Sequence, residues 1–207
     1  MTRPHGLQPP PRPLGDERKL LVLDLDETLV HASEFELPRQ AHFRVGPYHV
    51  YERPHVHAFI AHVRQRFRVG VWTSSGAQYA AQVVDHLFPK DALEFVWTSQ
   101  RCTTTRDWIS GGYQTIKKLE KLKAKGYRLE SIVAVDDTPA KYARSFGNLV
   151  TVSEFTGDES DDELLALMRY LDHLAEVPNV RAVEKRGWRR AVSDPGQAPR
   201  ESVAPPC

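Results

Sequence analysis

Five short apolar runs, separated by longer stretches with helical spacing, restrict this chain to a small set of folds. The runs cover residues 20–23, 69–72, 95–97, 132–135 and 149–152. They are continuously apolar, as strands are when both faces of a sheet are covered. Helices are expected over residues 54–66, 75–87, 113–125 and 138–144, because parallel strands need crossover connections. The pattern predicts an α/β fold with a mostly parallel sheet flanked by helices.

Two segments interrupt this alternation. Residues 41–51 hold two short β-rich pieces around Gly46 and Pro47, which predict a small hairpin near the end of the first strand. Residues 100–112 are polar and rich in Thr, which indicates an irregular or small β insertion. Neither segment is large enough to form a folded cap domain. A last helix is indicated by a capping box from Ser160 to Glu163 and by the apolar stripe that follows it.

Proline marks both ends of the chain. Of its 15 prolines, five lie in the first 13 residues and four in the last 13. Residues 1–17 are therefore predicted to be a disordered Pro-rich tail, and residues 179–207 a basic, Pro-containing C-terminal tail. In a chain of 207 residues this leaves one domain, over residues 18–178.

The composition excludes several classes of protein. With 41% hydrophobic and 27% charged residues, the chain is typical of globular proteins, and no apolar run approaches the ~18–20 residues of a membrane span. Lys and Arg total 28 against 27 Asp and Glu, so no general field favours nucleic acid or an anionic membrane as a partner. The two cysteines, Cys102 and Cys207, are too few for a disulfide framework, and the N-terminus lacks a secretory signal. A cytoplasmic location is expected.

Polar residues that follow the apolar runs indicate the chemistry. In open parallel sheets, ligands bind beyond the carboxyl ends of the strands, so residues at these ends are expected to converge. Asp24 and Asp26 follow the first run, Thr73 and Ser74 the second, and Asp136 and Asp137 the fourth. One lysine, Lys117, precedes the fourth run. Each has an ordinary structural explanation on its own, such as a strand end or a helix cap. Together they make up what phosphoryl transfer requires.

A carboxylate such as Asp24 can attack phosphorus to form an aspartyl-phosphate. A second carboxyl, Asp26, can protonate the leaving oxygen and later deprotonate water. Because a phosphate repels a carboxylate nucleophile, this chemistry needs a cation, and Mg²⁺ held by carboxylates is expected. Asp136 and Asp137 would supply ligands beside Asp24.

The phosphoryl group needs partners of its own. Lys117 would neutralise the phosphoryl oxygens, and Thr73, with Ser74 and the backbone amides that open the next helix, would bind them. Several lysines surround Lys117, so both Lys117 and Lys118 are candidates at this point.

Five segments occur in a characteristic order: LDLDETLVH at 23–31, RP at 53–54, VWTSSGAQYA at 71–80, KKL at 117–119 and VDDTP at 135–139. Taken together, they resemble the haloacid dehalogenase superfamily. They more closely resemble its FCP-homology branch, which includes the small phosphatases of the RNA polymerase II C-terminal domain and the NLI-interacting-factor proteins. The resemblance implies a Rossmann-like core without a cap, with a small β-hairpin flap and a short insertion.

The resemblance also implies roles for individual residues. Asp24 would be the nucleophile, and Asp26 the general acid and base that also gives a backbone carbonyl to Mg²⁺. Thr73 would bind phosphate, and Lys117, two residues before Leu119, would stabilise the intermediate.

The fourth motif departs from the family pattern. The family often has Asp-Asn where this chain has Asp136 and Asp137, and there the second residue is the metal ligand and the first orients the lysine. Asp137 is therefore favoured as the ligand, with Asp136 as the alternative. The additional carboxylate adds a negative charge, which can alter metal affinity.

The sequence therefore predicts a Mg²⁺-dependent phosphomonoester hydrolase that acts through an aspartyl-phosphate. A phosphorylated protein or peptide is the favoured substrate, because a capless site admits a side chain carried on a protein. The alternatives are a small phosphomonoester, a nucleic-acid terminal phosphate, or a non-catalytic phosphopeptide or protein-interaction module. A receiver-like phosphoacceptor is disfavoured, because there the acidic pair precedes the phosphoacceptor, whereas here Asp24 and Asp26 come first. No membrane partner is expected, and the near-neutral charge disfavours nucleic acid.

Overall fold

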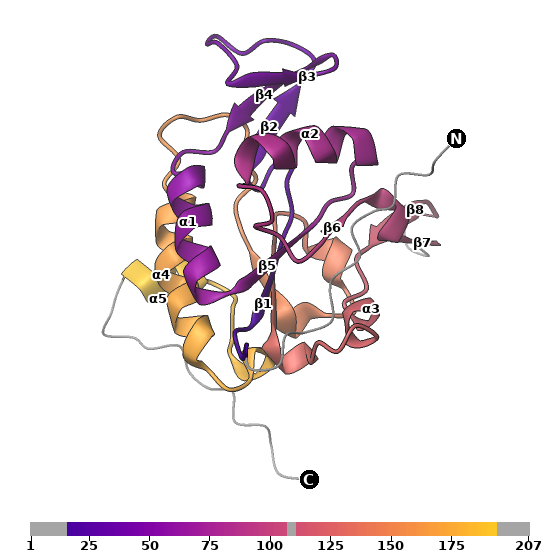
Figure 1. The fold of residues 1–207 in the computed structure, drawn as a ribbon, viewed down its shortest axis with the longest axis vertical. Coiled ribbons are helices and arrows are strands. Elements are labelled where there is room, and N and C mark those ends of the chain that lie inside the picture. The colour runs from indigo at the N-terminus through magenta and orange to yellow at the C-terminus, as the bar shows by residue number, and fades with distance from the viewer. Residues whose placement is uncertain (1–15, 107–110, 194–207) are drawn as a thin grey trace.

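A computed structural model describes residues 16–106 and 111–193, and its centre is a five-stranded sheet (Figure 1). The strand order is β10-β9-β1-β5-β6, and every neighbouring pair is parallel. The five strands are β1 (Leu20–Leu23), β5 (Arg68–Trp72), β6 (Val96–Trp97), β9 (Ile132–Asp136) and β10 (Leu149–Thr151). Each lies on one of the five predicted apolar runs, so the α/β fold with a parallel sheet is confirmed.

Both faces of the sheet are covered. Successive residues of a strand point to opposite faces, so Leu21 and Leu23 of β1 pack in one apolar cluster, and Leu20 and Val22 in another. The first cluster includes residues of the larger helices, of which α1 and α4 lie side by side (Figure 1). The α-helices are α1 (Val56–Arg66), α2 (Ala77–Leu87), α3 (Glu120–Lys123), α4 (Glu163–Glu176) and α5 (Trp188–Ser193). None of the helices within the described ranges has the length and apolar character needed to cross a membrane.

Gly70 allows strand β5 to pack closely against Phe95. A Cβ atom at residue 70 would lie 2.5 Å from the Phe95 ring, which is closer than real side chains approach. Glycine is therefore required here by the lack of space. Strand β5 ends just before Thr73, so this closely packed strand leads directly into the predicted site.

The helix predicted over residues 113–125 is wrong. The chain forms strand β8 (Tyr113–Ile116), which pairs with β7 (Thr103–Arg106) in a two-stranded antiparallel sheet, and only the short α3 follows. The aromatic and β-branched residues of β8 favour a strand that pairs with the Thr-rich β7. This pairing outweighs the tendency to form a helix that the spacing of the later lysines suggests. The predicted β insertion is thus present in the described part of 100–112, while residues 107–110 lie outside it.

The helix predicted over residues 138–144 is also replaced, because the short connection from β9 to β10 forms two 3₁₀ turns. These are η3 (Pro139–Tyr142) and η4 (Phe146–Asn148). Two further 3₁₀ turns are η1 (Ser99–Arg101) and η2 (Leu129–Ser131).

A small flap projects from the carboxyl end of the central sheet (Figure 1). It is a three-stranded antiparallel sheet in the order β2-β4-β3, formed by β2 (Val30–Ser33), β3 (Phe43–Val45) and β4 (Tyr48–Glu52). The predicted hairpin corresponds to β3 and β4, and Gly46 adopts the positive φ of 57° that the tight turn requires. Strand β2, which extends the hairpin, was not predicted.

The predicted last helix is confirmed as α4, but its capping box is not formed. Helix α4 begins at Glu163, and Asp162 rather than Ser160 is its N-cap residue. The Glu163 carboxylate accepts a hydrogen bond from the backbone N–H of Ser153 at 3.0 Å, so it ties the helix to the end of β10. The apolar stripe of α4 is buried, as predicted.

The packed chain continues beyond residue 178, where the sequence places the start of the C-terminal tail. The turn η5 (Val180–Ala182) precedes α5, and Trp188 of α5 is buried. Its indole Nε1 donates to the Thr151 carbonyl at 2.7 Å, and its ring lies 5.4 Å from that of Tyr170. The terminal residues 1–15 and 194–207 lie outside the described residues, so the tail predictions there stay predictions.

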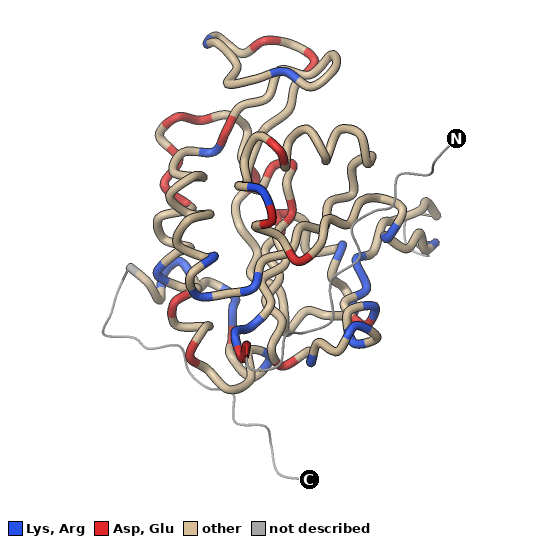
Figure 2. The backbone as a smooth tube through the Cα atoms, in the orientation of Figure 1, with Lys and Arg blue, Asp and Glu red and all other residues tan. Residues whose placement is uncertain are grey.

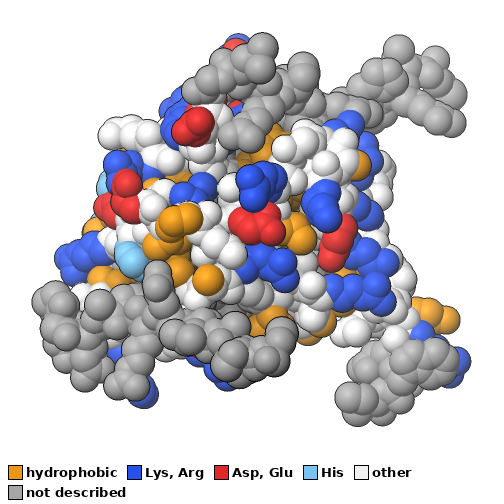
Figure 3. All heavy atoms as spheres, turned by 90° about the horizontal axis from the view of Figure 1, so that it is seen from below, with side chains coloured by type: hydrophobic (Ala, Val, Ile, Leu, Met, Phe, Trp, Pro, Cys, Tyr) orange, Lys and Arg blue, Asp and Glu red, His pale blue; other side chains and the backbone are white. Residues whose placement is uncertain are grey.

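Charges of both signs are spread over the fold, and basic residues are frequent in the lobe that contains β7, β8 and α3 (Figure 2). On the face seen from below, Lys and Arg side chains are interrupted by Asp, Glu and hydrophobic side chains (Figure 3). That face therefore differs from the continuous basic track that follows a nucleic-acid backbone.

Replacing Trp188 tests whether the segment after residue 178 is part of the folded unit. We expect Trp188→Ala to lower the free energy of unfolding by about 3–5 kcal/mol, because it removes a buried aromatic side chain. Arg190→Ala, at an exposed position of the same helix, should change it by less than about 0.5 kcal/mol. Urea unfolding measures both values. Equally small losses would mean that α5 does not pack on the core.

Candidate active site

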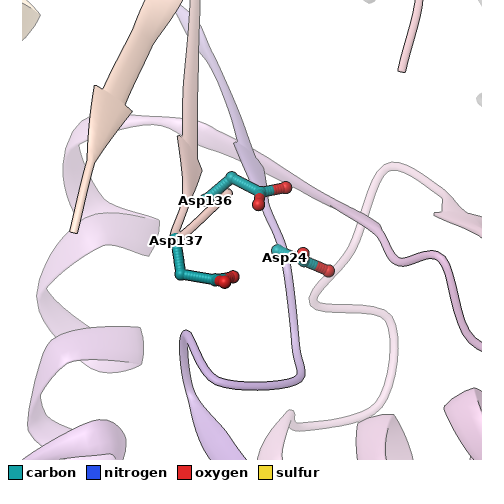
Figure 4. A group of neighbouring side chains, drawn as sticks. All are labelled: Asp24, Asp136 and Asp137. Atoms are coloured by element: carbon teal, nitrogen blue, oxygen red, sulfur yellow. The ribbon is translucent and has the colours of Figure 1, made fainter. Parts of the chain in front are cut away.

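Three carboxylates meet where strands β1 and β9 end (Figure 4). Asp24 directly follows β1, Asp136 is the last residue of β9, and Asp137 comes next. One carboxylate oxygen from each lies within 4.8 Å of the others. The parallel pairing of β1 and β9 brings these ends together, and the N–H of Asp24 extends the pairing by donating to the Val135 carbonyl at 3.0 Å. The structure thus brings together three residues that the sequence proposes as metal ligands.

Lys117 lies in the same cluster. Its Nζ is 2.9 Å from Asp24 Oδ2 and 2.6 Å from Asp136 Oδ2. The sequence places Lys117 on a helix, which is wrong, because it follows directly on strand β8. Of the two candidate lysines, Lys117 is the one that reaches these carboxylates in the described structure, since Lys118 makes no ion pair with them.

A second lysine, Lys141, faces the same carboxylates and was missed by sequence reasoning. Its Nζ lies 2.7 Å from Asp24 Oδ2, 3.1 Å from Asp136 Oδ1 and 3.9 Å from Asp137 Oδ1. Lys141 belongs to η3 and follows Asp137 by four residues. That spacing, which lets oppositely charged side chains meet on one side of a helical turn, is the signal that could have found it.

Burial makes the charges of this cluster depend on one another. The side chains of Asp24, Asp136 and Lys117 are each at most 2% exposed. Burial alone would raise the pKa of Asp24, but the ammonium groups of Lys117 and Lys141 outweigh it and hold that pKa below its usual range. Burial and the neighbouring Asp24 carboxylate raise the pKa of Asp136. Asp24 is therefore ionised, as the role of nucleophile predicted from the sequence requires.

Asp26 is held by hydroxyl groups rather than by ammonium groups. Its carboxylate accepts hydrogen bonds from Ser75 Oγ at 2.5 Å, Tyr79 OH at 2.6 Å and Thr73 Oγ1 at 3.3 Å. The chain turns sharply after Asp26, because Glu27 adopts a positive φ of 58°. The two aspartates of the first motif thus have different surroundings although one residue separates them.

Tyr79 and Ser75 are site residues that sequence reasoning did not assign, although both lie in the motif that carries the family resemblance. Burial and the nearby Asp26 carboxylate raise the pKa of the Tyr79 phenol far above its usual value. The phenol therefore stays protonated and donates to Asp26.

Thr73 and Ser74 lie between β5 and α2, as predicted for phosphate-binding residues. Thr73 Oγ1 accepts a hydrogen bond from the N–H of Ser75 at 3.0 Å and donates to Asp26. The Ser74 Oγ is buried without a hydrogen-bond partner within the described ranges. Helix α2 begins just beyond, at Ala77, with Gly76 as its N-cap residue, and a helix N-terminus favours a bound anion.

Two threonines hold the carboxylate of Asp137. Thr28 Oγ1 donates to Asp137 Oδ1 at 3.2 Å, and Thr138 Oγ1 donates to Asp137 Oδ2 at 2.7 Å. Thr28 is a further residue of the resemblance motifs whose role sequence reasoning missed. Its contact joins the turn after β1 to the end of β9.

The donor set of the cluster fits a hard divalent cation. Carboxylate oxygens are the ligands that Mg²⁺ prefers in proteins. Counted at full formal charge, the three carboxylates and the ammonium groups of Lys117 and Lys141 sum to −1 (−3 + 2). The side chain of Asp26 is not among the three clustered carboxylates, which leaves it for proton transfer.

Space is available beside Asp26. A hollow of about 320 Å³ is lined by Asp26, Ser75 and Tyr79 on one side and by Tyr48 and Ala32 of the flap on the other. It can receive the group that leaves when a phosphoryl group is transferred from a substrate.

Comparison with known proteins places most of the chain in one family. The family model "NLI interacting factor-like phosphatase" matches residues 19–181. The chain is 33% identical over 180 residues to the "Probable C-terminal domain small phosphatase" of Dictyostelium discoideum, covering 84% of this chain and 55% of that protein. It is 31% identical over 176 residues to the human "CTD small phosphatase-like protein", covering 82% of this chain and 60% of that protein. The chain thus spans less than two thirds of the length of either relative.

A solved structure supports the fold. The structure of Fcp1, described as an essential RNA polymerase II CTD phosphatase, matches with a TM-score of 0.60 and 14% identity, covering 76% of this chain and 62% of that one. At this identity the similarity concerns the fold alone, which is the α/β fold predicted from the apolar runs.

Removing Lys117 tests its part in holding the buried carboxylates. We expect Lys117→Met to lower the free energy of unfolding by about 3–5 kcal/mol in the presence of EDTA, because it leaves buried carboxylates with one ammonium group fewer. Lys118→Met removes the same charge one residue away and should cost less than about 0.5 kcal/mol. Urea unfolding compares them, and equal losses would refute the assignment of Lys117 to the cluster.

Proposed function

The chain belongs to the NLI interacting factor-like phosphatase family, and we propose that it is a Mg²⁺-dependent phosphatase that acts through an aspartyl-phosphate on Asp24. One observation carries the proposal: Asp24, Asp136 and Asp137 converge within 4.8 Å at the ends of two paired strands. Lys117 contacts two of them, and Asp26 lies beside a hollow.

The first step uses Asp24 as the nucleophile. An oxygen of its ionised carboxylate attacks the phosphorus, and the bond from phosphorus to the leaving oxygen breaks. Asp26, in its protonated form, gives its proton to that leaving oxygen. Lys117, with Thr73 and the amides at the start of α2, offsets the charge on the transferring phosphoryl oxygens. The products of this step are the alcohol and an aspartyl-phosphate.

The second step returns the enzyme to its starting state. Asp26, now a carboxylate, takes a proton from water while the water oxygen attacks the phosphorus. The bond between phosphorus and the Asp24 oxygen breaks, so Asp24 is again ionised and inorganic phosphate leaves. The hydroxyl donors Ser75 and Tyr79 keep the Asp26 carboxyl in one orientation through both steps.

Asp24, Asp136 and Asp137 would hold the metal, with Asp137 favoured over Asp136 as the direct ligand beside Asp24. Bound Mg²⁺ supplies positive charge that reduces the repulsion between the Asp24 carboxylate and the incoming phosphate.

A phosphorylated protein or peptide is the substrate class we favour. Between Thr28 and Thr73 the described chain forms the flap, α1 and β5, so no folded cap domain is inserted there. An open site accepts a phosphorylated side chain that remains attached to a protein. The names of the relatives, C-terminal domain small phosphatases, support the same class. A cytoplasmic location stays a prediction.

A small phosphomonoester and a non-catalytic interaction module are the competing functions. The small substrate is favoured if an aryl phosphate is hydrolysed with a higher kcat/KM than any phosphopeptide of a panel. The module is favoured if folded protein with bound Mg²⁺ turns over neither kind of substrate.

Variants of the two aspartates test the mechanism. With an aryl phosphate, we expect Asp24→Asn to have no detectable turnover and Asp26→Asn to lose roughly 10²–10⁴-fold in kcat. An aryl oxide leaves without a proton, so Asp26→Asn should still complete the first step and accumulate the mass of one phosphoryl group on the protein. Asp24→Asn should accumulate none. Steady-state kinetics and intact-protein mass spectrometry measure these outcomes.

The matched control is Asp85→Asn, an exposed position of α2 outside the site, which should keep wild-type kinetics. EDTA should abolish turnover, and added Mg²⁺ should restore it. A phosphoryl group that is found on Asp24→Asn would overturn the assignment of the nucleophile.

Tyr79→Phe tests whether the phenol orients Asp26. We expect kcat to fall by about 10-fold or more, because the substitution removes the hydrogen bond that the Tyr79 phenol donates to the Asp26 carboxylate. KM should stay near the wild-type value if the phenol does not contact the substrate. Tyr48→Phe is the control, because Tyr48 packs edge-on against Tyr79 at 5.9 Å and lines the same hollow. A similar loss of kcat in both variants would point to the hollow rather than to Asp26.

A further inference from the structure

Lys141 contacts all three carboxylates of the acidic cluster, whereas Lys117 contacts only two. The Nζ of Lys141 lies 2.7 Å, 3.1 Å and 3.9 Å from oxygens of Asp24, Asp136 and Asp137. These are the same side chains that a divalent ion would use. The Lys141 ammonium group therefore contacts every side chain of the cluster proposed to hold the metal.

The backbone fixes the place from which Lys141 reaches the cluster. Its N–H donates to the Thr138 carbonyl at 3.1 Å within η3. Its carbonyl accepts a hydrogen bond from the N–H of Lys117 at 2.8 Å, which joins η3 to the end of β8. The next residue, Tyr142, is fully buried, so it anchors the turn in the core. The backbone of Lys141 is thus held in place, and its side chain extends from it to the carboxylates.

The two lysines differ in their freedom to move. The Lys117 side chain is 0% exposed and lies 5.8 Å from the centre of the Tyr142 ring, so it is enclosed. The Lys141 side chain is 18% exposed, and its four-carbon stem is flexible. The Lys141 ammonium can therefore leave the cluster for solvent without any movement of the backbone.

We propose that Lys141 is a tethered cation that neutralises the three carboxylates and competes with the divalent metal for them. The inference rests on the proposed function in one respect, namely that the cluster is the metal site. A divalent ion bound to the same carboxylate oxygens would repel the Lys141 ammonium group strongly at these distances in a partly buried site, and Lys141, unlike the enclosed Lys117, has a route to solvent. Lys141 thus keeps the cluster folded before the metal binds, and it lowers the affinity for the metal.

Metal binding measured without turnover tests this competition. Mg²⁺ is titrated calorimetrically into metal-stripped wild type, Lys141→Met and Lys118→Met. We expect Lys141→Met to bind Mg²⁺ at least about tenfold more tightly, since the competing charge is gone and the stem is kept. Lys118→Met removes a nearby charge that does not contact the carboxylates and should stay within about threefold of wild type.

Stability measurements give a second readout of the same competition. In EDTA, Lys141→Met should melt at a lower temperature than wild type, because the carboxylates repel one another with one cation fewer. Saturating Mg²⁺ should then raise the melting temperature more in Lys141→Met than in wild type. Lys141→Gln keeps a polar group but removes the charge, so it should shift the Mg²⁺ affinity and the melting temperatures in the same directions as Lys141→Met. It provides the test if Lys141→Met does not fold.

An unchanged or weaker affinity for Mg²⁺ in both Lys141 variants would overturn the proposal. So would an absence of Mg²⁺ binding in wild type and both variants, whatever their activity. A tighter affinity in protein that hydrolyses no phosphate would support the competition while it refutes the phosphatase. The two proposals can therefore fail separately.

Discussion

The site depends on one constraint: the charges buried at the ends of β1 and β9 must be balanced by charges of opposite sign. Asp24, Asp136 and Lys117 are almost wholly buried, and an unpaired charge in such a place costs several kcal/mol. Each charge is delivered by a separate segment, and these segments are far apart in sequence. The β7–β8 insertion therefore contributes to the site, because Lys117 directly follows β8. A hydrogen bond from the backbone N–H of Lys117 to the carbonyl of Lys141 also joins the insertion to η3. The fold and the site are stabilised by the same contacts.

The same first motif gives two aspartates two environments. Asp24 lies among ammonium groups that keep it ionised, whereas Asp26 lies among the hydroxyls of Thr73, Ser75 and Tyr79. Hydroxyl donors bind a carboxyl group in either protonation state, because they can also accept. In the proposed mechanism, a group that gains and loses a proton is thus separated from one that stays charged. The roles proposed for the two aspartates therefore follow from their environments rather than from residue type, as in enzymes with paired carboxylates.

The features that could be predicted from the sequence are those encoded locally. Continuous apolar runs gave the five strands, and the residues after them gave Asp24, Thr73 and Asp136, because parallel strands end at one edge of a sheet. The helix expected around Lys117 was wrong, because pairing with β7 outweighs the spacing of the lysines. Trp188 was assigned to a tail, because nothing nearby in the sequence indicates its contact with Thr151. Tyr79 was missed for a similar reason, since its partner Asp26 is distant in the chain, whereas Lys141 had a local signal in its spacing of four residues from Asp137.

The pair formed by Asp137 and Lys141 explains how this chain carries Asp-Asp where the family resemblance leads one to expect Asp-Asn. With asparagine at 137 and a neutral residue at 141, the formal charges of Asp24, Asp136 and Lys117 would sum to −1. With Asp137 and Lys141 present, the formal sum is again −1, because one negative and one positive charge are added together. The electrostatic attraction for a divalent ion is thus similar at long range in the two arrangements. At short range they differ, because Lys141 occupies the carboxylates directly and has to be displaced. The departure from the family pattern therefore changes how the metal is admitted more than the charge that attracts it.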